Sequence, residues 1–167
     1  MARASTSASG WLAGIAVLCV GAVAAALVSQ HVFNMQPCPW CVLQRFIYLV
    51  LAVLALAGAF IAGRARRILA WLGLLVALSG VGAALWQQLA AVNENSCDLS
   101  LAERITTGLH LDRLAPQLFI AYASCADAAV SVLHVPFAVW SCIMFALLAL
   151  LFAWTLRAMV RAARPRY

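Results

Sequence analysis

Four long apolar stretches constrain the fold of this chain more than any other feature of its sequence. They lie at residues 11–30, 42–62, 68–89 and 135–156. Each is close to the length of about 20 residues that lets a helix cross a hydrocarbon layer roughly 30 Å thick. Hydrophobic residues make up 66% of the chain and charged residues 10%, whereas soluble domains are about 45–50% apolar. We therefore expect an all-α polytopic membrane protein, with residues 1–167 forming a single membrane domain built as a four-transmembrane-helix bundle.

The basic residues predict how this bundle is oriented. Most of the arginines fall on one side of it: Arg3, Arg64, Arg66, Arg67, Arg157, Arg161, Arg164 and Arg166. Short loops rich in arginine are retained in the cytoplasm, so that side and both chain ends are expected to be cytoplasmic. The net charge of +6 is then a consequence of topology. We expect these arginines to be solvated flanks of the helices, with the lipid bilayer and no nucleic acid as a partner.

Two loops lie on the opposite side of the predicted bundle, at residues 31–41 and 90–134. The second loop contains all five acidic residues of the chain: Glu94, Asp98, Glu103, Asp112 and Asp127. Within it, Ser100 and Glu103 fit a capping box that opens a short helix, and Gly108 closes that helix. Apolar residues between 109 and 122 either lie flat on the membrane surface or cap the open end of the bundle. We expect short surface helices in this loop, and the sequence leaves both positions open.

The first apolar stretch has an alternative interpretation as a cleaved signal peptide. Its core at residues 11–28 is longer than the roughly 7–15 residues of a signal sequence, and Arg3 is the only basic residue before it. We therefore expect this stretch to remain as the first membrane span.

The six cysteines divide into two groups by position. Cys19 and Cys142 lie inside apolar stretches, where a thiol behaves as a small apolar side chain. The other four lie on the side opposite the arginines: Cys38, Cys41, Cys97 and Cys125. A zinc site would need a second close pair of cysteines or closely spaced histidines, so we expect no metal. A structural disulfide is the remaining alternative to a reactive one for the Cys-x-x-Cys unit.

That unit lies in the segment PCPWCVLQRF, residues 37–46. Cys41 is at or just before the first residue of the second predicted span, where the amides of a helix N-terminus stabilise a thiolate. Arg45 follows one helical turn later on the same face. An arginine that only snorkels toward the interface is the alternative. We predict instead that Arg45 and the helix terminus together favour the thiolate of Cys41.

Taken in this order, the residues resemble the disulfide bond formation protein B (DsbB) family of bacterial inner-membrane thiol oxidases. The resemblance covers nearly the whole chain: four spans, a first loop with Cys-x-x-Cys followed by Arg45, and a second loop with two cysteines. The segment LDRLAPQLF, residues 111–119, also looks like the second loop of that family. The related vitamin K epoxide reductase type places its Cys-x-x-Cys after the loop cysteines, which is the opposite order.

The resemblance implies an enzyme that oxidises a periplasmic, DsbA-like thioredoxin-fold protein and passes two electrons to ubiquinone or menaquinone in the membrane. It places both loops in the periplasm. Cys97 would form the mixed disulfide with the partner, and Cys125 would be its resolving cysteine. Cys38 would exchange with Cys125, which leaves Cys41 as the thiolate facing the quinone. Arg45 would lie beside the quinone ring.

Two further hypotheses concern the quinone site and a non-catalytic role. Some members of the family carry a histidine near the periplasmic end of the third span, where this chain has only Trp86, Gln87 and Gln88 as larger polar or aromatic residues. His31 is a possible substitute. A four-span scaffold, similar in outline to tetraspanins, would explain a disulfide in the second loop, but it would not explain Cys-x-x-Cys followed by an arginine at a helix start.

Overall fold

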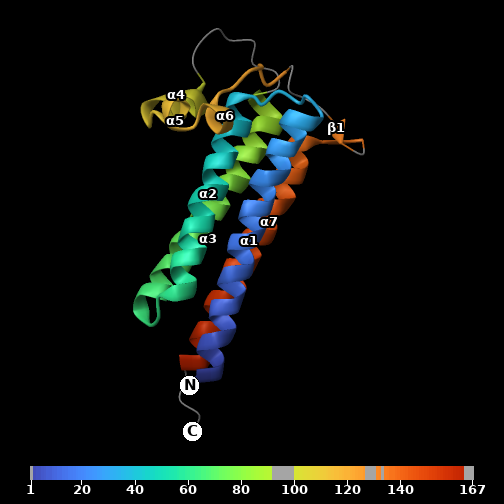
Figure 1. Cartoon of the computed structure of the whole chain (residues 1–167). Coiled ribbons are helices and arrows are strands. Elements are labelled where there is room, and N and C mark those ends of the chain that lie inside the picture. Colours follow the sequence, from blue (N-terminus) through green and yellow to red (C-terminus); the bar gives the residue numbers. More distant parts are fainter. Residues whose placement is uncertain (1, 92–99, 127–130, 133, 164–167) are drawn as a thin grey trace.

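The computed structural model describes residues 2–91, 100–126, 131–132 and 134–163. Four long helices run side by side in it (Figure 1). They are α1 (Ala2–Val32), α2 (Pro39–Phe60), α3 (Arg64–Trp86) and α7 (Phe137–Ala163). Among the described residues, these are the four helices that are long and apolar enough to cross a membrane. The expected all-α membrane bundle is therefore confirmed.

The long helices form a ring in which each packs against the next. Contacts join α1 to α2, α2 to α3, α3 to α7, and α7 back to α1. The start of α1, the turn between α2 and α3, and the end of α7 all lie at one end of the bundle (Figure 1). The arginines of the turn and of the last helix are therefore gathered at that end, as the topology argument requires.

Two glycines let α3 approach α7 closely. A Cβ atom on Gly73 would overlap the ring of Phe152, and one on Gly80 would overlap the ring of Phe145. Small residues at such contacts let helix backbones come together, and this close packing holds helices together in lipid. Phe145 also stacks on Tyr48 of α2, with ring centroids 4.1 Å apart and planes 7° apart. These aromatic contacts tie α2, α3 and α7 together.

The observed helices extend beyond the predicted spans. α2 begins at Pro39 rather than at residue 42, because proline is well suited to the first position of a helix. α3 begins at Arg64 rather than at residue 68, and Gly63 makes the turn with a φ of 74° that favours glycine. In α3 the apolar stretch stops at the arginines, but the backbone hydrogen bonds of the helix continue through them.

One arginine at the arginine-rich end of the bundle contradicts the expectation of a solvated flank. Arg66 is only 7% exposed, and its Nε donates to the carbonyl oxygens of Gly58 at 3.0 Å and Ile61 at 2.8 Å. Carbonyls at the end of a helix lack partners within it, so Arg66 caps the C-terminal end of α2. The described neighbours Arg64, Arg67, Arg157 and Arg161 are exposed, as expected.

The opposite end of the bundle carries the short elements (Figure 1). They are the π-helical turn η1 (Gln87–Ala91), helices α4 (Leu101–Gly108), α5 (Leu111–Leu114) and α6 (Pro116–Phe119), and a hairpin of β1 (Ser131–Val132) with β2 (Val135–Pro136). The predicted helix start is confirmed, because the Ser100 side chain accepts a hydrogen bond from the amide of Glu103 at 3.3 Å. Its predicted end at Gly108 is confirmed as well.

Part of the second loop takes the expected capping position, and its place on the membrane surface stays a prediction. Phe119 is buried against Val42 of α2 and Leu111 of α5, so this part of the loop caps the bundle. Leu109 and Leu114 are 50% and 77% exposed. Apolar side chains of this second kind are available to the membrane surface.

Candidate redox site

The Cys-x-x-Cys unit forms the first turn of α2. Cys38 is the N-cap residue, its Sγ accepts a hydrogen bond from the Cys41 amide at 3.4 Å, and the two Sγ atoms are 2.9 Å apart. Pro39, with its fixed φ, begins the helix between them. Cys38 has 0% exposure, whereas Cys41 is half-buried. One sulfur is therefore sealed inside the fold, and the other has access to its surroundings.

The second loop is held against the first loop by its backbone. The amides of Tyr122 and Ala123 donate to the carbonyl oxygen of Pro37 at 3.0 and 3.4 Å. These bonds place the following residues beside the start of α2. Cys125 consequently packs in the same apolar cluster as Cys38.

Three of the four predicted catalytic cysteines thus lie together. Cys125 and Cys41 are both hydrogen-bonded to Cys38, and these bonds, together with burial, raise the pKa of the Cys38 thiol above its ordinary value. The fourth, Cys97, lies outside the described residues, as do the acids Glu94, Asp98 and Asp127.

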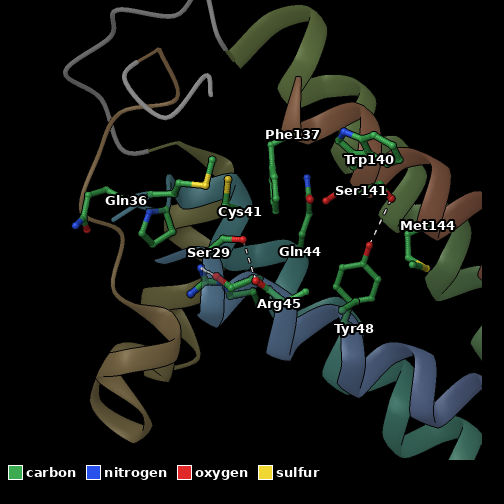
Figure 2. Close-up of a pocket in the computed structure, with 15 residues that line it drawn as sticks. Ser29, Gln36, Cys41, Gln44, Arg45, Tyr48, Phe137, Trp140, Ser141 and Met144 are labelled. Carbon is green, nitrogen blue, oxygen red and sulfur yellow. Dashed lines mark hydrogen bonds between the residues drawn. The ribbon is translucent and has the colours of Figure 1, made fainter. Parts of the chain in front are cut away.

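A cavity of about 200 Å³ opens beside Cys41, between α1, α2 and α7. A single water needs only about 10–15 Å³ of such space. Figure 2 shows two facing rows of side chains in this cavity. The row from α2 consists of Cys41, Gln44, Arg45 and Tyr48, and the row from α7 consists of Phe137, Trp140, Ser141 and Met144. The remaining wall consists of Ala22, Ala25, Ala26 and Ser29 of α1 and of Met35, Gln36 and Pro37 before α2, so the cavity suits a largely apolar ligand with a few polar atoms.

Arg45 reaches this cavity as a buried cation with neutral partners. It is 5% exposed, and its guanidinium donates to Gln30 Oε1 at 2.7 Å and to the carbonyl oxygen of Leu118 at 3.3 Å. Within the described part of the chain, its Nε has no hydrogen-bond partner, and no carboxylate pairs with it. The site therefore has a buried positive charge that no carboxylate of the described residues offsets.

Two buried glutamines complete the site, and the sequence reasoning assigned a role to neither. Gln87 Nε2 donates to Cys41 Sγ at 3.3 Å and to Cys38 Sγ at 3.4 Å. Gln87 Oε1 accepts from Gln44 Nε2 at 2.7 Å. The available signal was the presence of amide side chains within apolar spans, where polar residues often mark function.

The proposed substitute histidine does not line the cavity. His31 is exposed at the end of α1, whereas the preceding residue, Gln30, is buried and hydrogen-bonded to Arg45. The geometry as a whole suits thiol–disulfide exchange at a helix N-terminus, next to a cavity in the membrane-spanning part of the bundle.

Comparison with known proteins agrees with this site. A family model described as disulfide bond formation protein DsbB matches residues 8–155. The chain is 37% identical over 139 residues to disulfide bond formation protein B of Ralstonia nicotianae, covering 81% of this chain and 86% of that protein. It is 34% identical over 142 residues to disulfide bond formation protein B 1 of Pseudomonas syringae pv. syringae, covering 82% of each. The protein of Cupriavidus metallidurans with the same name as the first is 31% identical over 140 residues. No solved structure matches the chain.

Proposed function

We propose a path for electrons through this chain, which belongs to the disulfide bond formation protein B family. As a member of that family it is a thiol:disulfide oxidoreductase that acts in disulfide bond formation, and it is a multi-pass membrane protein. We infer that it reoxidises a periplasmic DsbA-like thioredoxin-fold protein and passes the electrons to ubiquinone or menaquinone. The observation that carries this proposal is the contact of Cys125 with Cys38, whose partner Cys41 lines the apolar cavity.

The residues around the cavity fit a quinone. The cavity wall is mainly apolar, and the guanidinium side chain of Arg45 adds a cation to it. A quinone bound there supplies an acceptor for two electrons and two protons. We assign Arg45 to hold a quinone oxygen, and Cys41 to face the ring, because both side chains line the same wall of the cavity (Figure 2).

The exchange begins in the second loop. One thiolate of the partner attacks Cys97 of a Cys97–Cys125 disulfide, so that a mixed disulfide forms and Cys125 leaves as a thiolate. The second thiolate of the partner then attacks the mixed disulfide. The partner leaves oxidised, and Cys97 keeps the electron pair of the broken bond.

The next steps move two electrons to the start of α2. The Cys125 thiolate attacks Cys38 of a Cys38–Cys41 disulfide, and Cys41 leaves with the electron pair of the broken bond. Cys97 then attacks Cys125, which restores the Cys97–Cys125 disulfide and releases Cys38. The reduced pair Cys38 and Cys41 now holds the two electrons and two protons of the partner. Delivering them at the cavity reforms the Cys38–Cys41 disulfide.

The geometry favours attack at Cys38 with departure of Cys41. Cys125 contacts Cys38, and a thiol whose pKa is raised is the poorer leaving group. Cys41 lies in the first turn of α2, where helix amides stabilise a departing thiolate. DsbA-type partners are strong oxidants, with potentials of about −120 mV. Their reoxidation therefore requires a strongly oxidising acceptor.

The test separates the two halves of this path. In Cys97→Ser, oxidation of a reduced DsbA-like protein should stop, because the entry disulfide is gone. A small dithiol that reduces the chain through Cys125 or Cys41 should still drive reduction of a short-chain quinone. Stopped-flow absorbance of the quinone follows the second activity. Loss of both activities in a folded variant would contradict the division of labour between the loops.

We also propose that the arginine-rich end of the single membrane domain faces the cytoplasm of a bacterial inner membrane. The support is the asymmetry of arginine between the two ends of the bundle. Reporter cysteines at Ser5 and Thr107, each in a cysteine-free chain, should react with impermeant maleimide from opposite sides of the membrane. Reaction of both from the periplasm would overturn this orientation.

A further inference from the structure

We propose that Gln87 is a further catalytic residue, whose side-chain amide donates to the reacting sulfurs and stabilises the thiolate released at Cys41. The inference rests on the electron path proposed above. It adds to that path a hydrogen-bond donor on α3, which faces the cysteines from outside the Cys-x-x-Cys segment.

Both polar atoms of the Gln87 side chain have hydrogen-bond partners within the site. An amide nitrogen has two hydrogens, and Nε2 lies 3.3 Å from Cys41 Sγ and 3.4 Å from Cys38 Sγ. The oxygen accepts from Gln44 at 2.7 Å. A flipped Gln87 would turn its oxygen toward the sulfurs and its NH₂ toward the NH₂ of Gln44. In this arrangement Gln44 binds the oxygen of Gln87, and the NH₂ group of Gln87 faces the two sulfurs.

The backbone places Gln87 for this contact. α3 ends at Trp86, and the chain continues as the π-helical turn η1 from Gln87 to Ala91. Such turns widen the helix locally, change the direction of side chains, and are frequent at functional sites. Trp86 is 51% exposed, whereas Gln87 is 6% exposed. Gln87 also continues the buried face of α3, which includes Gly80 and Ala84 at helical spacing, so the helix itself directs this side chain toward α2.

The donor acts most strongly at one stage of the exchange. When Cys38 is joined to Cys125 in a disulfide, its sulfur is neutral and Cys41 carries the negative charge. Hydrogen bonds to a charged acceptor are stronger than those to a neutral one, and they are stronger still in a buried, weakly polar site. Gln87 therefore stabilises the state in which the electrons have just reached the cavity side of the pair.

The experiment measures the reactivity of Cys41 without any quinone. Cys38→Ser keeps an oxygen at the N-cap and leaves Cys41 as a lone thiol, in the full-length chain purified in detergent. Iodoacetamide reacts with the thiolate form, and peptide mass spectrometry follows Cys41 apart from the other cysteines. Adding Gln87→Leu should slow this alkylation roughly tenfold to hundredfold at pH 7, as expected for the loss of a hydrogen bond to a charged group. Adding Gln88→Leu, the matched control in the same turn, should leave the rate unchanged.

The sign of the change separates catalysis from packing. If Gln87 only fills space, Gln87→Leu loosens the site, and alkylation of Cys41 becomes faster or stays the same. Either result overturns the proposal. Gln87→Glu keeps the size and the bond from Gln44 but replaces the donor with an acceptor, so it should slow alkylation at least as much. If the leucine variant does not accumulate, a normal rate in Gln87→Glu overturns the proposal in the same way.

A second measurement keeps this inference distinct from the electron path. The unaltered chain is given a small dithiol and a short-chain quinone. If it reduces no quinone, the proposed path fails. The alkylation experiment still tests Gln87, because it does not depend on quinone. If it does reduce quinone, Gln87→Leu should lower kcat more than it raises the KM for quinone, because the donor contacts the sulfurs rather than the cavity.

Discussion

Arg45, near the start of α2, and Arg66, which caps its end, are buried to nearly the same degree. Their hydrogen-bond partners differ. Arg45 is 5% exposed and Arg66 is 7% exposed. Arg66 donates to carbonyls at the end of α2 itself, including those of Gly58 and Ile61. Arg45 lies among three elements, α1, α2 and α6, and keeps an Nε without a hydrogen-bond partner among the described residues. Burial alone therefore does not distinguish the two arginines, whereas the hydrogen-bond partners of their donors do.

The two positions also differ in what offsets the buried charge. The C-terminal end of a helix is partly negative, so it favours the Arg66 cation directly. Arg45 has only the neutral oxygens of a side-chain amide and of backbone carbonyls. A buried cation without a counter-charge is costly. An anion formed at Cys41, on the same cavity wall, would offset that cost.

The largest effect should come from Arg45→Met. We expect the apparent affinity or rate of the quinone step to fall roughly tenfold to hundredfold, because one charge-assisted interaction of ~1.5–3 kcal/mol is lost. Binding of the protein partner should not change. Steady-state kinetics with varied quinone concentration measure the first effect, and a partner pull-down measures the second.

Arg45→Lys provides the control for charge. Lysine keeps the positive charge but not the planar fork of donors, so its kinetics should fall between those of the unaltered chain and Arg45→Met. Normal quinone kinetics in Arg45→Met, at normal abundance, would contradict a role of Arg45 in the quinone step. Arg45 and Arg66 would then not differ in function.

Arg66→Met should have the opposite character. The carbonyls at the end of α2 would lose their donor, which costs about 1–3 kcal/mol when such groups remain buried. We expect a lower thermal midpoint in detergent, with unchanged quinone kinetics in the protein that remains folded. A kinetic defect at low temperature without a loss of stability would show that the arginine-rich end also contributes to turnover.

Gly63→Ala should affect stability alone and leave quinone kinetics unchanged. Gly63 has a φ of 74° and a ψ of −141° in the turn before α3, a conformation that glycine alone adopts readily, so a Cβ there costs about 1–3 kcal/mol through backbone strain. The same melting experiment measures it. Because nothing lies within 4 Å of a Cβ at this position, a loss much larger than that of Arg66→Met would show that the turn, rather than the Arg66 cap, holds this end together.

The bundle and its reactive cysteines were predictable because hydropathy and spacing are local properties. Four helices follow from four apolar stretches, and Cys41 falls at a helix start because Pro39 and the apolar run begin together. The contacts of Arg45 with Gln30 and Leu118 depend on how α1 and α6 are rotated and packed against α2. That information lies in tertiary packing.

The same reason explains why Arg66 and Gln87 were assigned no such roles. An arginine in a basic turn is usually solvated, and only the position of the preceding helix end shows that Arg66 caps it. Gln87 lies on the buried face of α3, three residues after Ala84, but its contact with the sulfurs depends on how α3 packs against the start of α2.

The complete burial of Cys38 has a consequence for selectivity among thiols. Cys38 has 0% exposure, and the contacts of the second loop with Pro37 bring Cys125 against it from within the protein. A small thiol dissolved outside therefore has no direct approach to Cys38, however reducing it is. Tethering gives the internal sulfur a high effective concentration instead. A dissolved dithiol must therefore enter through Cys41 or Cys125, which are only half-buried, and direct attack on Cys38 is left to the sulfur that the second loop holds beside it.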